Sequence, residues 1–159
     1  MSDTRPSIEL FVRSLSPNGA AQQQEAILSR LDRLDERGVV DDYTVTIWGE
    51  RIVPESLAAQ TDTGREMRET VEQFRTWADE RGVSLDRFFT DQTIHSAITG
   101  DRYSATALPV FAMAEYEDGE LRSVTPHERD EGTLTVEDRL EALGEQATHK
   151  DGQPAAPVA

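Results

Sequence analysis

Two short segments of the chain carry apolar side chains on both faces of an extended strand. The first is Ser7–Leu15 and the second is Thr106–Tyr116, which is a nearly unbroken apolar run. In the first, Ile8 and Val12 point to one side and Phe11 points to the other. A strand has this pattern when it is covered on both sides. We therefore predict two central strands of a sheet that has helices on both faces.

Two further strands are predicted beside them. In DYTVTIWG, apolar residues alternate with threonines from Tyr43 to Trp48, which is typical of a half-exposed strand at a sheet edge. The acidic-glycine sequence EDGE at Glu117–Glu120 predicts a tight hairpin turn. Leu121–Pro126 would then be the returning strand of that hairpin.

The pentapeptide DERGV occurs twice, at Asp35–Val39 and at Asp79–Val83, each time after a segment with helical spacing of apolar residues. Glycine just beyond a helix takes a positive φ without strain, and the apolar residue that follows packs back on the last turn. The pentapeptide is therefore interpreted as a helix stop that is used twice. The second helix is expected to begin at Thr63, with Glu66 completing a capping box. A third helix is predicted at Thr135–Leu143, with Thr135 as its N-cap.

This order of elements resembles the thioredoxin-like superfamily. LFVRSLSPNGAAQQQEAILSRL places a loop and a helix after the first strand, and ALPVFAMAEYEDGELRSV is similar to the segment with the cis-proline, buried strand and hairpin. The resemblance implies an α/β fold, a β-α-β-α-β-β-α three-layer sandwich with a mixed four-stranded sheet. We expect one domain over residues 1–145, with an irregular insertion at 85–106 and a mobile tail at 146–159.

The resemblance also implies a binding groove. In redox-active relatives a CxxC motif follows the first strand, but here its place is taken by Ser16, Pro17, Asn18 and Gly19, and the chain has no cysteine. Thiol–disulfide exchange is therefore excluded. What would remain is the peptide groove between this loop and a cis bond joining Leu108 and Pro109. This interpretation predicts a non-enzymatic binding or adaptor module, with regulation as one option, whose partner is another protein or a peptide.

A second resemblance indicates a different class of function. ILSRLDRLDERGVVDDYTV, at Ile27–Val45, resembles the recognition helix and following strand of Lrp-type winged-helix transcriptional regulators. A helix-turn-helix needs a helix directly before the recognition helix, whereas here a β-rich stretch precedes it. The arginines of this helix alternate with acidic residues that would repel phosphate. DNA binding is therefore kept as the alternative to the adaptor.

The charge balance is unusual, because the chain has 31 acidic and 16 basic residues and Lys150 is its only lysine. A net charge of −15 is tolerated best in concentrated salt, where self-repulsion is screened. The composition resembles that of haloarchaeal proteins that work in molar salt, and codon bias in a GC-rich genome is the alternative cause. With no apolar segment long enough to cross a membrane and no signal peptide, a cytoplasmic protein is expected.

Few residues suggest catalysis or metal binding. The histidines His95, His127 and His149 lie far apart and are interpreted as surface residues. No phosphate-binding loop or nucleophile motif is present, so we expect neither a cofactor nor a metal. An enzyme with a site formed by Leu85–Thr106 is the weakest of the three function classes.

Overall fold

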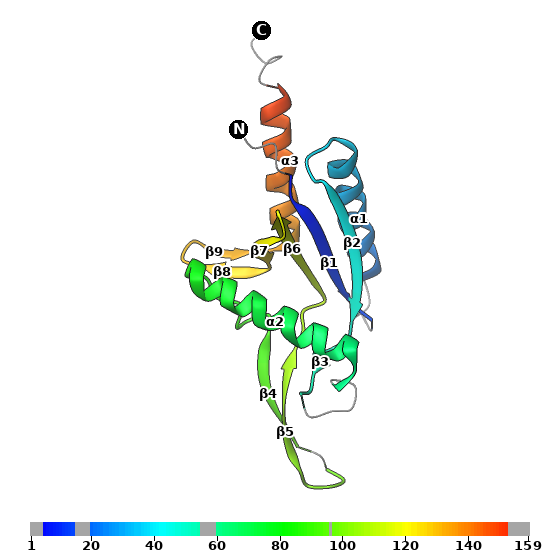
Figure 1. Ribbon diagram of the computed structural model, residues 1–159, viewed down its shortest axis with the longest axis vertical. Coiled ribbons are helices and arrows are strands. Elements are labelled where there is room, and N and C mark those ends of the chain that lie inside the picture. Colours follow the sequence, from blue (N-terminus) through cyan, green and yellow to red (C-terminus); the bar gives the residue numbers. More distant parts are fainter. Residues whose placement is uncertain (1–4, 15–19, 55–59, 96, 153–159) are drawn as a thin grey trace.

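The computed structural model describes residues 5–14, 20–54, 60–95 and 97–152 (Figure 1). Its elements are β1 (Ser7–Arg13), α1 (Ala20–Glu36), β2 (Asp42–Trp48), β3 (Arg51–Ile52), α2 (Asp62–Arg81), β4 (Thr90–His95), β5 (Arg102–Ala107), β6 (Phe111–Glu117), β7 (Glu120–Thr125), β8 (His127–Arg129), β9 (Gly132–Leu134) and α3 (Val136–Gly152).

The main sheet has four strands in the order β2-β1-β6-β7. β1 is parallel to β2 and antiparallel to β6, and β6 is antiparallel to β7. The two segments with apolar side chains on both faces are therefore the central strands, and the alternating segment is at the edge, as predicted. The fold is mixed α/β.

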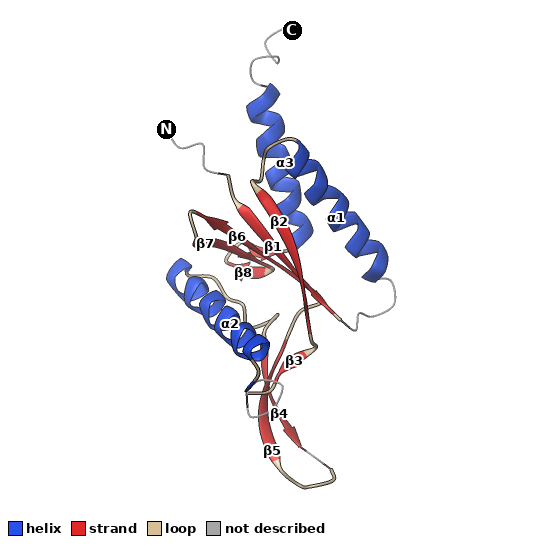
Figure 2. Cartoon of the chain, turned by 45° about the vertical axis from the view of Figure 1, so that its right-hand side comes forward, coloured by secondary structure: helices blue, strands red, loops and turns tan. Residues whose placement is uncertain are grey.

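Helices cover the two faces of this sheet (Figure 2). On one face, α1 and α3 pack on Ile8, Leu10 and Val12 of β1. On the other face, α2 packs on Phe11 and on the small residues of β6. Aromatic rings join the sheet to α2, with the ring centroids of Phe11 and Phe74 5.6 Å apart. The three-layer arrangement is confirmed.

Both copies of DERGV end a helix as expected. Gly38 and Gly82 have φ values of 74° and 70°. The N–H of Val39 donates to the carbonyl of Leu34, and the N–H of Val83 donates to that of Ala78. These are the backbone bonds of a Schellman motif. The hairpin between β6 and β7 is also confirmed, since Asp118 and Gly119 at its turn both have positive φ.

Two helix boundaries differ from the predictions. The N-cap of α2 is Thr61, whose Oγ1 accepts the N–H of Gly64, so the expected cap at Thr63 is wrong. The α3 helix is capped by Thr135 as predicted, but it continues to Gly152 instead of ending at Leu143. The expected tail therefore begins in a helix, and residues 153–159 lie outside the described residues.

The segment at 85–106, predicted to be irregular, forms regular structure. β4 and β5 pair antiparallel from Thr90↔Ala107 to His95↔Arg102, and β3 joins the other edge of β5. The β4–β5 ribbon projects away from the three-layer body (Figure 1). Its pairing was missed because most of its residues are polar, so the ribbon lacks the apolar alternation that indicates a strand.

Candidate functional site

Leu108 and Pro109 lie in the connection from the ribbon to the central strand β6. In the described part of the chain the cis X-Pro bond is that of Thr125-Pro126, so the predicted cis bond before Pro109 is wrong. The chain reaches Pro109 from the β4–β5 ribbon, whereas the thioredoxin-like interpretation had an irregular insertion there. The other half of the predicted groove, Ser16, Pro17, Asn18 and Gly19, lies outside the described residues, so the groove stays a prediction.

The backbone around Pro109 already has partners within the chain. The N–H of Leu108 donates to the carbonyl of Glu50 at 2.8 Å, and its carbonyl accepts from the guanidinium of Arg13 at 3.3 Å. The Pro109 carbonyl accepts from the indole N–H of Trp48 at 3.2 Å. An extended peptide could not use the N–H of Leu108 without displacing its internal bond, and it would share the two carbonyls with the donors that they already have.

The helix that resembles a recognition helix lies flat on the sheet. Ile27, Leu31 and Leu34 of α1 are buried, so the remaining faces of the helix carry its charges. Two of its side chains bond to neighbouring elements. Arg30 donates to the backbone carbonyl of Glu137 in α3, and Asp32 accepts a hydrogen bond from the hydroxyl of Tyr43 in β2. That bond, with burial adding to it, raises the pKa of Tyr43 to about 12.

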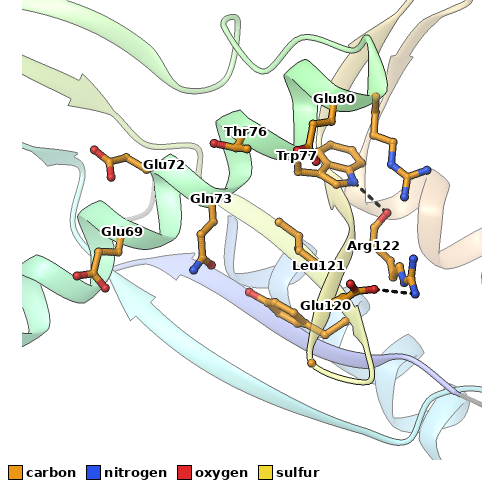
Figure 3. A pocket seen from close by; sticks show the side chains of 12 residues that line it. Glu69, Glu72, Gln73, Thr76, Trp77, Glu80, Glu120, Leu121 and Arg122 are labelled. Atoms are coloured by element: carbon orange, nitrogen blue, oxygen red, sulfur yellow. Dashed lines mark hydrogen bonds and ion pairs between the residues drawn. The ribbon is translucent and has the colours of Figure 1, made fainter.

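A groove lies between α2 and the β6–β7 hairpin (Figure 3), with a volume of about 730 Å³. The indole N–H of Trp77 donates to the carbonyl of Arg122 across it at 3.0 Å. Four glutamates and two arginines line it: Glu69, Glu72, Glu80, Glu120, Arg81 and Arg122. Arg122 is itself paired with Glu120, with Nη2 and Oε2 3.0 Å apart. The groove is acidic, and an acidic surface repels nucleic-acid phosphate.

The β4–β5 ribbon presents two different faces. On one face Ala105 is buried, and Ile94 and Tyr103 are half-buried. The other face carries, toward its outer end, the directly opposed pairs Thr93↔Ser104 and His95↔Arg102, with all four side chains exposed. These four side chains have hydrogen-bond donors and acceptors and include no carboxylate.

The base of the ribbon is anchored to α2. Arg75 donates to the Asp91 carboxylate at 2.9 Å and to the carbonyl of Phe89 at 3.1 Å. The bond from Arg75, with a second from Thr106, holds the pKa of Asp91 below its ordinary value. Asp91, the acid on the polar face of the ribbon, is therefore paired with a cation of α2. At the outer end, Asp101 lies in the turn and Ile98 is 96% exposed.

The two histidines whose side chains the structure describes, His95 and His127, do not form a site. His127 is buried, which corrects its prediction as a surface residue, and its Nδ1 lies 2.7 Å from the carbonyl of Val124. His95 is exposed, as predicted. Across the described residues no group of three or more His, Cys, Asp or Glu side chains could hold a metal ion. Among the described helices, none is long and apolar enough to cross a membrane.

Comparison with known proteins gives one result. A family model described as "Helix-turn-helix domain" matches residues 1–148. No curated protein and no solved structure matches the chain. The family match agrees with the weaker of the two resemblances, and the comparisons do not support a thioredoxin-like relative. Because the match spans nearly the whole chain, the protein belongs to this helix-turn-helix domain family.

Proposed function

We propose that the protein binds DNA and regulates transcription. The observation that carries this proposal is the family match over residues 1–148, because helix-turn-helix domains are DNA-binding modules. DNA binding thereby takes precedence over the adaptor function. The adaptor has less support, because the backbone groups of Leu108 and Pro109 that a peptide would use have partners inside the protein.

The geometry supports a strand element as the part of the protein that would contact DNA. A helix-turn-helix has two helices joined by a turn of about three or four residues. In the described residues, α1 and α2 are separated by β2 and β3, and α2 and α3 are separated by six strands. A two-stranded ribbon also fits the major groove. The β4–β5 ribbon is a two-stranded element that projects away from the three-layer body (Figure 2).

The charge of the molecule sets how such a ribbon would read DNA. Phosphate contacts release counterions and lose their strength as salt concentration rises. The chain has a net charge of −15. If it works in concentrated salt, its choice between DNA sequences would depend on hydrogen bonds to base edges. Arg102 can pair with guanine, and the hydroxyls of Thr93 and Ser104 can donate to or accept from several bases.

The test is selection of bound genomic fragments by the full chain in about 2 M KCl. We expect an enriched sequence motif for the unaltered protein and at least a tenfold loss of affinity for it with Arg102→Glu. Gln73→Glu is the control for added negative charge, because it lies at an exposed position of α2 away from the ribbon; it changes the net charge by one where Arg102→Glu changes it by two. It should bind as the unaltered chain does.

Two outcomes would contradict the proposal at different levels. Selection that yields no motif, with the protein folded, would reject DNA binding. A motif that survives Arg102→Glu but is lost with Arg33→Glu would keep DNA binding and assign the contacts to α1 in place of the ribbon.

A further inference from the structure

The outer edge of β2 is open. β2 is the last strand of the main sheet, and in the described residues no strand pairs with its outer side. The carbonyl of Trp48 faces inward, since it accepts the N–H of Ser14 at 2.8 Å. Backbone groups alternate in direction along a strand, so those of Tyr43, Val45 and Ile47 point outward.

Within the part of the chain that the structure describes, the stretch of this edge from Tyr43 to Trp48 lacks the usual protections against pairing. Natural sheets guard their edges with charges, prolines, bulges or covering elements. From Tyr43 to Trp48 the sequence YTVTIW contains no charge, proline or glycine, although 30% of the chain is charged. Val45 and Ile47 lie on the same side of the sheet as α1, but at its edge, and they are 41% and 57% exposed. By contrast, the opposite edge strand β7 carries the charged residues Glu120 and Arg122. The indole of Trp77 also donates a hydrogen bond to the carbonyl of Arg122 in this strand.

The order of residues on this edge is symmetric about Val45. Reading outward from Val45, a threonine stands on each side, and a large apolar or aromatic residue follows each threonine. If two such strands run antiparallel with Val45 opposite Val45, then Thr44 meets Thr46 and Tyr43 meets Ile47. Threonine pairs and aromatic–β-branched pairs are favourable cross-strand neighbours.

We propose that the partner of this edge is a second copy of the same chain, in a two-fold symmetric dimer. Val45 would form a hydrogen-bonded pair with its counterpart, and Tyr43 with Ile47 would form the next hydrogen-bonded pair on either side. Each hydrogen-bonded pair exchanges two N–H···O bonds. The two sheets would join into one continuous sheet, and the two α1 helices would lie on its same face. A self-complementary patch of this kind is what a two-fold interface requires.

The acidic residues near the edge are compatible with this pairing. In the same register, Asp42 lies opposite Trp48 and Asp41 opposite Gly49, so no two carboxylates stand directly opposed. Each copy still brings a net charge of −15, and this long-range repulsion opposes association in dilute buffer. Salt screens it, with a Debye length of about 3 Å at 1 M. Dimerisation should therefore strengthen as KCl rises.

A cysteine cross-link tests both the partner and the register. The chain has no cysteine, so each substitution introduces one unique thiol. In Val45→Cys the two thiols would sit on a hydrogen-bonded pair with Cα atoms about 5.5 Å apart, within disulfide range. In Ile47→Cys they would be about 14 Å apart along the strands and could not be bridged. Ile98→Cys places the thiol on a fully exposed ribbon turn as a control for random collisions.

In about 2 M KCl the unaltered chain should have twice the monomer mass by light scattering, and Val45→Lys should have the monomer mass. Under mild oxidation only Val45→Cys should give a disulfide-linked dimer. A monomeric unaltered chain at every salt and protein concentration would overturn the proposal and leave the edge for a strand of another protein. Cross-linking of Ile47→Cys in preference to Val45→Cys would overturn the register. These measurements contain no DNA, so they do not depend on the proposed function.

Discussion

At the scale of single residues, one ion pair lies inside the three-layer body. Glu115 of β6 is 3% exposed, and both of its carboxylate oxygens accept from Arg139 of α3, at 2.8 and 2.9 Å. This bond raises the pKa of the Arg139 guanidinium, while burial works in the opposite direction. A buried carboxylate that loses its partner is expensive, because it stays removed from water.

Arg139→Ala should therefore destabilise the protein by about 2–4 kcal/mol, toward the lower end because the Arg139 side chain is partly exposed. Chemical unfolding measures this. The double replacement Glu115→Leu/Arg139→Met removes both charges together and should recover most of the loss. If the double variant were as unstable as Arg139→Ala, the cost would come from lost packing and not from an unpaired carboxylate.

At the scale of elements, the helix ends give a matched pair of glycine tests. Gly82 has a φ of 70°, and an added Cβ there would meet nothing within 4 Å. Gly82→Ala should therefore cost about 1–2 kcal/mol through backbone strain alone. Gly144 lies inside α3 with equally open surroundings, so Gly144→Ala should stabilise by about 0.5–1 kcal/mol. Equal effects of the two substitutions on the unfolding free energy would contradict the Schellman interpretation.

The elements that could be predicted are those with a strong local signal. The covered strands, the edge strand with Tyr43, the Asp118-Gly119 turn and both DERGV helix ends each follow from a pattern of a few residues. The β4–β5 ribbon could not be predicted from apolar periodicity, because its strands pair mainly with each other through polar residues. Its available signals were the β-branched residues of Thr90–His95 and a turn at Thr99–Asp101.

The candidate sites were harder to predict than the elements. The groove beside Pro109 was inferred from a resemblance, and that resemblance cannot show that Trp48 and Arg13 bond to the same backbone. The isomer of the bond before Pro109 is set by tertiary contacts, which sequence patterns do not contain. The open edge of β2 was visible in the alternation of YTVTIW. Its symmetry about Val45 gained meaning only once the outward direction of the backbone groups was known.

At the scale of the whole molecule, we expect the net charge of −15 to lower stability in dilute buffer. Many described cations are already paired, as in Arg75 with Asp91 and Arg139 with Glu115, so the excess acids repel one another on the surface. We expect the thermal midpoint to rise strongly between dilute buffer and about 2 M KCl as this repulsion is screened. Salt also strengthens apolar burial, so a control must separate the two effects.

A variant with fewer charges provides that control. Glu69, Glu72, Glu80 and Glu120 line one groove, and changing all four to glutamine removes four negative charges from one surface (Figure 3). If self-repulsion is the cause, this variant should melt at a higher temperature than the unaltered chain in dilute buffer. The two midpoints should then converge in 2 M KCl, where screening has already removed the difference. Melting curves that stay parallel at all salt concentrations, or that do not respond to salt, would contradict adaptation of this chain to concentrated salt.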